Sequence, residues 1–64
     1  MNLVENLVDE IAWRYKVGKI DSINAETIIS TTEDIYPHLD PEKGSEVAFQ
    51  AAMKLYGNKN IVLL

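Results

Sequence analysis

The sequence predicts an all-α fold: a small three-helix unit with an apolar C-terminal tail, completed by homo-oligomerisation. In three segments of the 64-residue chain, about residues 2–16, 25–36 and 41–56, apolar residues recur every three or four positions. This spacing places them on one face of a helix. Residues that favour helix starts and ends separate the three segments. The third segment is also apolar around most of its circumference, which is typical of a helix enclosed by other elements. The chain is therefore expected to form a single helical domain.

The first segment predicts an amphipathic helix over about residues 2–16. Its polar face carries acids mainly toward the start and bases toward the end, which complements the helix dipole. Gly18 supplies a natural stop for this helix. The apolar face comprises Leu3, Val4, Leu7, Val8, Ile11, Ala12 and Tyr15.

The second segment has a helix start with a clear mechanism. Asn24 can cap the free backbone N–H groups, and Ile23 and Ile28 stand at the positions of a hydrophobic staple. Pro37 disfavours continuing the helix through the residue before it. Residues 27–32 have poor intrinsic helix propensity, so packing must stabilise this helix, and a strand over these residues remains an alternative. The expected apolar stripe comprises Ile28, Ile29, Thr32, Ile35 and Tyr36.

The third segment combines a strong start with an unusual distribution of apolar residues. Asp at the cap and Pro at the first helical position begin a helix at Asp40-Pro41, and Gly57 ends it. Small residues on one side would let a neighbouring helix approach closely. A second, bulky face could lie inside a three-helix bundle or in a subunit or partner interface. The small residues are Ala48, Ala51 and Ala52, and the bulky ones are Phe49, Met53 and Tyr56.

Four consecutive apolar residues end the sequence: Ile61, Val62, Leu63 and Leu64. Three interpretations are open for this tail. It could seal the core of its own chain, exchange with a neighbouring subunit as an arm, or offer a short strand to a different partner. A strand would need a second strand to satisfy its backbone groups, most simply from another copy.

Trp13 lies on the side of the first helix opposite its apolar stripe, and Val17 extends this off-stripe patch by one turn. One interpretation is that the tail or the loop at Ile20 folds back over the indole. The other is that Trp13 anchors an interface, because tryptophan is enriched among residues that dominate binding energy. We include both residues in the expected interface, together with the bulky face of the third helix and the tail.

Composition restricts the possible functions. A domain this small is marginally stable unless disulfides, a metal or oligomerisation add to its core, and the chain has no cysteine and one histidine. Ten acidic against six basic residues give a net charge of −4, which makes nucleic acid an unlikely partner and leaves protein partners, including a second copy. We expect no membrane span, no signal peptide and a cytoplasmic location.

Catalytic and metal-binding motifs do not stand out in the sequence. His38, Asp40 and Glu42 alternate along one turn and could in principle bind a hard metal. Asp40 is already explained as a helix cap, and Glu42 as a first-turn acid. We therefore expect no enzyme, no catalytic residue, no metal and no cofactor.

These observations predict a non-enzymatic, oligomeric protein-interaction module that acts as a small adaptor or inhibitor by occupying another protein's surface. In size and style it resembles accessory proteins of phages and mobile elements. The alternative is a small dimeric DNA-binding transcriptional regulator, in which two chains combine Arg14, Lys16 and Lys19 into a basic strip. A third hypothesis is that the acidic residues mimic nucleic-acid phosphates.

Overall fold

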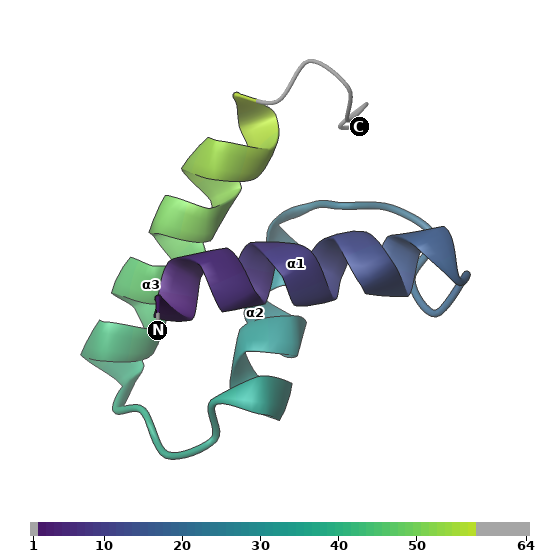
Figure 1. The fold of residues 1–64 in the computed structure, drawn as a ribbon. Coiled ribbons are helices and arrows are strands. Elements are labelled where there is room, and N and C mark those ends of the chain that lie inside the picture. Colours follow the sequence, from purple (N-terminus) through teal and green to yellow (C-terminus); the bar gives the residue numbers. More distant parts are fainter. Residues whose placement is uncertain (1, 58–64) are drawn as a thin grey trace.

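The computed structural model describes residues 2–57, which form α1 (Leu3–Lys16), α2 (Ala25–Ile35) and α3 (Pro41–Tyr56) (Figure 1). These residues contain no strand, and each helix packs against the other two. The prediction of an all-α fold with three helices is confirmed. The strand alternative for residues 27–32 is wrong, because this segment lies inside α2. The tail, residues 61–64, lies outside the described residues, and homo-oligomerisation stays a prediction.

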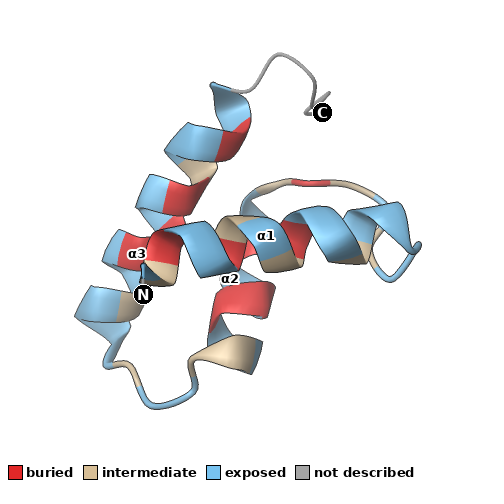
Figure 2. Ribbon diagram, viewed as in Figure 1, coloured by how far each residue is buried: buried red, intermediate tan, exposed pale blue. Residues whose placement is uncertain are grey.

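The core lies where the three helices meet, and each helix turns one buried side toward it (Figure 2). Burial of apolar side chains at this junction is the main force that holds the helices together. Ile23 joins the core from the loop before α2, at the staple position expected from the sequence. The buried apolar residues are Val4, Leu7, Ile11, Ile23, Ile28, Val47, Ala48, Ala51 and Leu55.

A glycine-dependent motif ends α1. Gly18 has φ +83°, a left-handed conformation that other residues rarely adopt. Its N–H donates to the carbonyl of Tyr15, and the N–H of Lys19 donates to the carbonyl of Arg14 at 2.8 Å. This pair of bonds is a Schellman motif. It reverses the chain and directs Lys19 back toward α1.

A reciprocal cap begins α2. The Asn24 side chain accepts a hydrogen bond from the Thr27 N–H, and the Thr27 hydroxyl accepts one from the Asn24 N–H, each at 2.9 Å. Asn24 is thus the expected cap. The helix begins at Ala25 and ends at Ile35, so Tyr36 is the C-terminal cap rather than a helical residue.

One contact ties the end of α2 to α1, and a local cap begins α3. The Tyr36 hydroxyl donates to the carbonyl of Leu3 at 3.0 Å, which ties the end of α2 to the start of α1. After a short turn, the Asp40 side chain accepts the Lys43 N–H at 2.8 Å, with Pro41 in the first helical position. The first contact thus fixes α2 against α1, and the second begins α3 a few residues after α2 ends.

Three residues expected on apolar stripes are exposed: Ala12, Tyr15 and Ile29. Tyr15 is 47% exposed because the buried positions of α1 end at Ile11, and the last turn of α1 extends past the core. Ile29 is 51% exposed because the core-facing side of α2 is centred on Ile28. A neighbouring residue on a helix points about 100° away. No helix within residues 2–57 is long and apolar enough to cross a membrane.

Candidate protein-interaction surface

Three large apolar side chains of α3 remain exposed. Phe49, Met53 and Tyr56 have exposed fractions of 67%, 60% and 55%. Their spacing of four and then three residues places them within an arc of roughly 60° on the helix surface. We call this set the α3 strip. It is a continuous apolar ridge that follows the C-terminal half of α3.

The α3 strip lies almost opposite the side of α3 that faces the core. The buried side is formed by Val47, Ala48, Ala51 and Leu55. At about 100° per residue, its centre and the centre of the strip are separated by roughly 150°. In Figure 2 the buried segments of α3 face the other helices, and its outward side is exposed. The interpretation in which α1 and α2 enclose α3 on all sides therefore does not describe residues 2–57.

A groove borders the same outward region of α3. It has a volume of about 380 Å³ and lies between the end of α2 and the start of α3, with Ile29 on one wall and Ala48 on the other. Ser45 also lines the groove and lies on the flank of α3 that leads round to the strip. The strip and the groove can therefore contribute to one larger contact surface.

Trp13 and Val17 form a second exposed patch, on α1. They are 48% and 50% exposed, which agrees with their expected off-stripe position. The Lys19 ammonium lies 4.9 Å from the centroid of the indole ring. An ammonium at this distance is attracted to the negative face of the ring. The loop therefore does return to Trp13, through Lys19 rather than through the expected Ile20, and still leaves half of the indole exposed.

The two patches do not merge into one site. Trp13 and Val17 point away from the core on α1, and the α3 strip points away from the same core on a different helix. Helices that pack around one core expose their outer sides in different directions. The expected interface residues within the described chain therefore fall into two separate surfaces, while the expected interface residues 61–64 lie outside the described residues.

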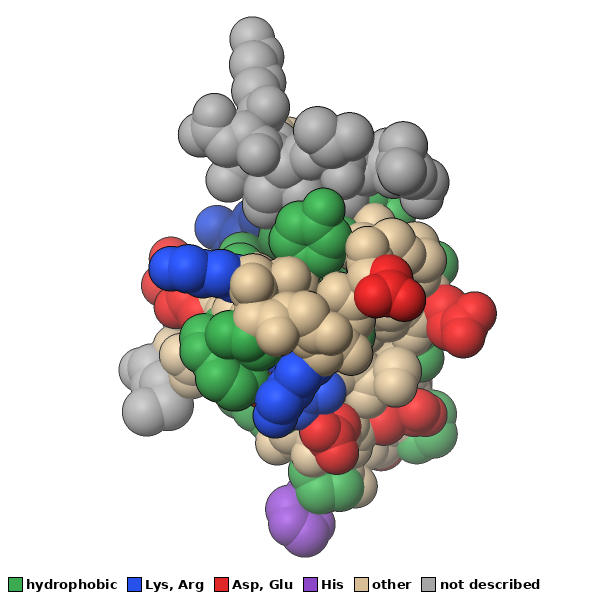
Figure 3. Space-filling view, turned by 90° about the vertical axis from the view of Figure 1, so that its right-hand side faces the viewer, with side chains coloured by type: hydrophobic (Ala, Val, Ile, Leu, Met, Phe, Trp, Pro, Cys, Tyr) green, Lys and Arg blue, Asp and Glu red, His purple; other side chains and the backbone are tan. Residues whose placement is uncertain are grey.

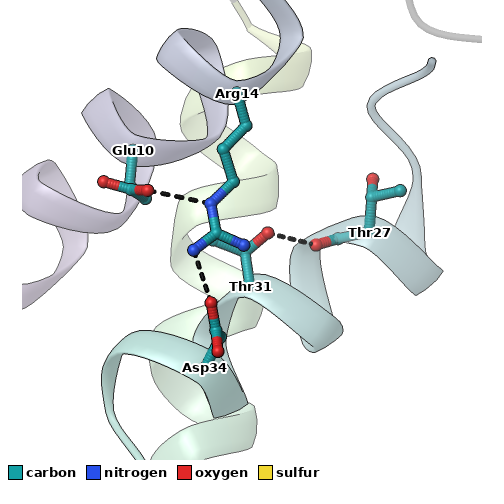
Figure 4. A network of polar contacts seen from close by, with 5 residues as sticks. All are labelled: Glu10, Arg14, Thr27, Thr31 and Asp34. Carbon is teal, nitrogen blue, oxygen red and sulfur yellow. Dashed lines mark hydrogen bonds and ion pairs between the residues drawn. The ribbon is translucent and has the colours of Figure 1, made fainter. Parts of the chain in front are cut away.

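An ion-pair network links α1 to α2 beside the core (Figure 4). The Arg14 guanidinium donates from Nε to Glu10 Oε2 at 2.8 Å and from Nη2 to Asp34 Oδ2. Hydrogen bonds to Asp34 and Glu10 raise the pKa of Arg14 above its ordinary value. Arg14 belongs to the basic strip that the DNA-binding alternative would use, and here two carboxylates already compensate its charge. That alternative stays a prediction.

The surface lacks a broad area of one charge on the face shown in Figure 3, where hydrophobic, basic and acidic side chains are intermixed. Asp40 serves as the cap of α3 rather than as part of a site with His38 and Glu42. No group of three or more His, Asp or Glu side chains in residues 2–57 is arranged to hold a metal ion. The described residues thus offer apolar contact area as their distinctive chemistry.

Two parts of this surface were not predicted from the sequence. The groove depends on the angle between α2 and α3, for which no local motif exists. The position of Lys19 over Trp13 could have been predicted from Gly18. A glycine directly after a helix indicates a chain reversal, which brings the next residue back to the last turn of that helix.

These features define the class of the molecule as a small all-α protein with three helices and an exposed apolar ridge on the third. No protein-family model, curated protein or solved structure matches the chain.

Proposed function

We propose that this protein is a non-enzymatic protein-interaction module that binds a partner protein through the α3 strip. The carrying observation is that Phe49, Met53 and Tyr56 are more than half exposed on the side of α3 that the core does not use. More than half of each of these three bulky apolar side chains is left uncovered by the fold of residues 2–57. They are available to a partner that covers them.

The chemistry of the strip supports this proposal. Aromatic residues and methionine are enriched in protein interfaces, and the flexible methionine side chain adapts to the shape of a partner. Anchors at positions i, i+4 and i+7 of a helix fit an apolar groove on another protein. Phe49, Met53 and Tyr56 have this spacing. The module acts as an adaptor or inhibitor, since its effect is to occupy a surface.

The size of the strip indicates that it is the centre of a larger contact. A stable interface buries about 800 Å² on each partner, which three side chains alone do not provide. The groove beside Ile29 and Ala48 lies next to the strip and supplies further area. We therefore infer an interface with the strip at its centre and the groove at its edge. The partner is a second copy of this chain or a different protein.

Site-specific photo-crosslinking in the producing cell tests the proposal. A photoreactive phenylalanine analogue, such as p-benzoylphenylalanine, replaces Phe49, which conserves the aromatic ring. The matched control carries the same analogue at Gln50, an exposed residue about 100° around the same helix turn. Adducts are identified by mass spectrometry.

The expected result is a defined adduct from position 49 that is absent from position 50. An adduct with twice the chain mass assigns the partner as a second copy, and any other single mass assigns a different protein. Position 49 yielding no adduct, or the same adducts as position 50, would overturn the proposal.

A further inference from the structure

We propose that the α3 strip binds the Trp13 patch of a second copy of this chain, so that copies associate head to tail. The Trp13 patch is formed by Trp13, Lys16, Val17 and Lys19 on α1 and the turn after it. This inference rests on the proposed function and names the partner of the strip. It follows from the opposite charges that border the two exposed apolar surfaces.

Carboxylates border the α3 strip and its groove. Glu42 and Glu46 are exposed, and each precedes a residue of the strip by seven positions, so both continue its line toward the start of α3. Glu33 and Asp40 line the groove, and no Lys or Arg of the described chain does. Lys43 lies about 60° around α3 from Glu46, on the side away from the strip. A matching partner surface therefore carries positive charge beside its apolar residues.

The Trp13 patch has this combination. Lys16 follows Trp13 by three positions, which places it about 60° around α1. The Lys19 ammonium lies 4.9 Å from the centroid of the indole ring. Both lysines are exposed, and the two ion pairs found within residues 2–57 belong to Arg14 rather than to either lysine. A half-exposed indole is thus accompanied by two ammonium groups that can meet carboxylates of a partner.

The apolar side chains of the two surfaces match in spacing. Trp13 and Val17 are four positions apart, as are Phe49 and Met53, and four helical residues rise about 6 Å. With α1 of one copy antiparallel to α3 of the next, Trp13 lies beside Met53 and Val17 beside Phe49. The contact between Trp13 and Met53 is favourable, because a thioether sulfur interacts well with aromatic rings.

The charges match in the same antiparallel arrangement. Lys16 comes within about 6 Å of Glu46 along the helix axes, which their two extended side chains can span. Asp9 is exposed one turn before Trp13 and comes level with Tyr56, whose hydroxyl can donate to it. A parallel arrangement would instead bring Asp9 level with Glu46. The order of charges along the two helices therefore favours the antiparallel contact.

Pairing of two α3 strips is the competing arrangement for a second copy. In a parallel pair, Glu42 and Glu46 would meet the same carboxylates of the other chain, and like charges oppose association. In an antiparallel pair, the described part of α3 brings no Lys or Arg onto the line of the strip to meet them. Either pairing also leaves the Trp13 patch exposed, whereas head-to-tail contact covers both apolar surfaces.

Head-to-tail contact does not close within a pair of copies. The strip and the Trp13 patch lie on different helices and face in different directions, so each chain binds one neighbour at each surface. Repetition of such a contact gives a ring or an open filament. The complete assembly therefore contains three or more chains.

Mixing two single variants tests this arrangement. Trp13→Ala keeps the strip and loses the indole, while Phe49→Ala keeps the Trp13 patch and loses an anchor of the strip. Tyr15→Ala is the control on α1, because Tyr15 is 47% exposed and lies about 160° around the helix from Trp13. Gln50→Ala is the control on α3, because Gln50 is exposed about 100° from Phe49. Light scattering up to millimolar concentration measures solution mass, and circular dichroism checks the fold.

We expect the parent and both controls to reach the mass of three or more chains, and Trp13→Ala and Phe49→Ala to stay monomeric alone. Their equimolar mixture should form a two-chain complex with twice the mass of either variant, because one intact strip meets one intact patch. A monomeric parent or a monomeric mixture would overturn the proposal. Association of Trp13→Ala alone would also overturn it, since two strips would then bind each other.

Charge reversal provides a second test at exposed positions. Lys16→Glu or Glu46→Lys alone should weaken association about tenfold, because each brings like charges together at the contact. The two reversals in one chain should restore the association of the parent. A double variant that associates no better than the single variants would contradict the proposed contact.

Crosslinking at position 49 separates this inference from the proposed function. An adduct that maps to the residues around Trp13 in a second copy supports both. An adduct with a different protein, or with α3 of a second copy, leaves the proposed function standing and overturns this inference. The absence of a specific adduct would overturn both.

Discussion

Thr31 and Thr32 occupy buried positions in α2, although threonine is a poor helix former. Each hydroxyl donates to a backbone carbonyl one turn earlier, Thr31 to Thr27 and Thr32 to Ile28, both at 2.7 Å. No buried side-chain nitrogen or oxygen in residues 2–57 lacks a partner. The hydroxyls are thus accommodated by the helix itself, and the core needs no polar contact from another helix.

Replacing Thr31 with valine therefore has a small effect on stability. Valine keeps the branched shape and removes the donor, while the Thr27 carbonyl retains its helical backbone bond. We expect the free energy of unfolding to change by less than about 1 kcal/mol. Urea denaturation of Thr31→Val measures this change. A loss of 2 kcal/mol or more would show that the hydroxyl has a further role in the core.

Asn24 contributes through the reciprocal cap with Thr27. Asn24→Ala removes the side-chain acceptor for the Thr27 N–H, and we expect a loss of about 1 kcal/mol in the free energy of unfolding. Asn6→Ala is the control, because Asn6 is exposed inside α1 and alanine is the better helix former. The cap has no energetic role if both variants unfold at the same urea concentration.

The sequence predicts some of these residue roles and misses others for physical reasons. The Asn24 cap follows from a local motif. The partial exposure of Tyr15 does not follow from a local motif, because it depends on how far α1 extends beyond the helices packed against it. Periodicity indicates the direction in which a side chain points, and only the fold shows whether another element is present there.

At the scale of elements, Arg14 connects α1 with α2 through Glu10 and Asp34 (Figure 4). The Asp34 side chain is 64% exposed, so water and salt screen its attraction to Arg14. We expect Arg14→Met to lower the free energy of unfolding by at most about 1 kcal/mol at low salt.

Salt titration provides the check for this network. Raising the salt concentration should reduce the difference in unfolding free energy between the parent and Arg14→Met, because only the parent has ion-pair attraction to lose. A difference that stays constant between low and high salt would assign the effect to packing of the Arg14 side chain rather than to its charge.

The sequence predicts that α3 is apolar on two sides, but it does not show what covers the second side. The expected alternatives were a helix enclosed by its own bundle and a helix with a face in an interface. The described structure shows Val47 and Leu55 buried and Phe49 exposed, so α1 and α2 cover only one side. Two short helices do not provide enough surface to enclose a third. The apolar periodicity of a helix does not indicate how much of its surface the neighbouring helices cover.

At the scale of the whole molecule, the state of assembly depends on what covers the α3 strip. Deleting residues 61–64 tests the interpretation of these residues as an arm exchanged with a neighbouring subunit. Light scattering across a concentration series measures the solution mass of the parent and the shortened chain. An exchanged arm predicts an oligomeric parent and a monomeric shortened chain, and the same solution mass for both chains would contradict it.

The all-α architecture with its three helices could be predicted from the sequence because caps, stops and apolar spacing agree in each segment. The partner could not be predicted, since its identity depends on the surface that recognises the strip. That information lies in another molecule or in the assembly of several copies.

The central claim is that Phe49 is dispensable for the fold and available to a partner. Chemical denaturation of Phe49→Ala beside Leu55→Ala tests this claim most directly, because the two residues lie about 120° apart around α3 and are 67% and 0% exposed. We expect Leu55→Ala to lose roughly 2 to 5 kcal/mol of unfolding free energy, and Phe49→Ala to lose less than about 1 kcal/mol. A loss from Phe49→Ala as large as that from Leu55→Ala would contradict the account, because Phe49 would then belong to the core of the folded chain.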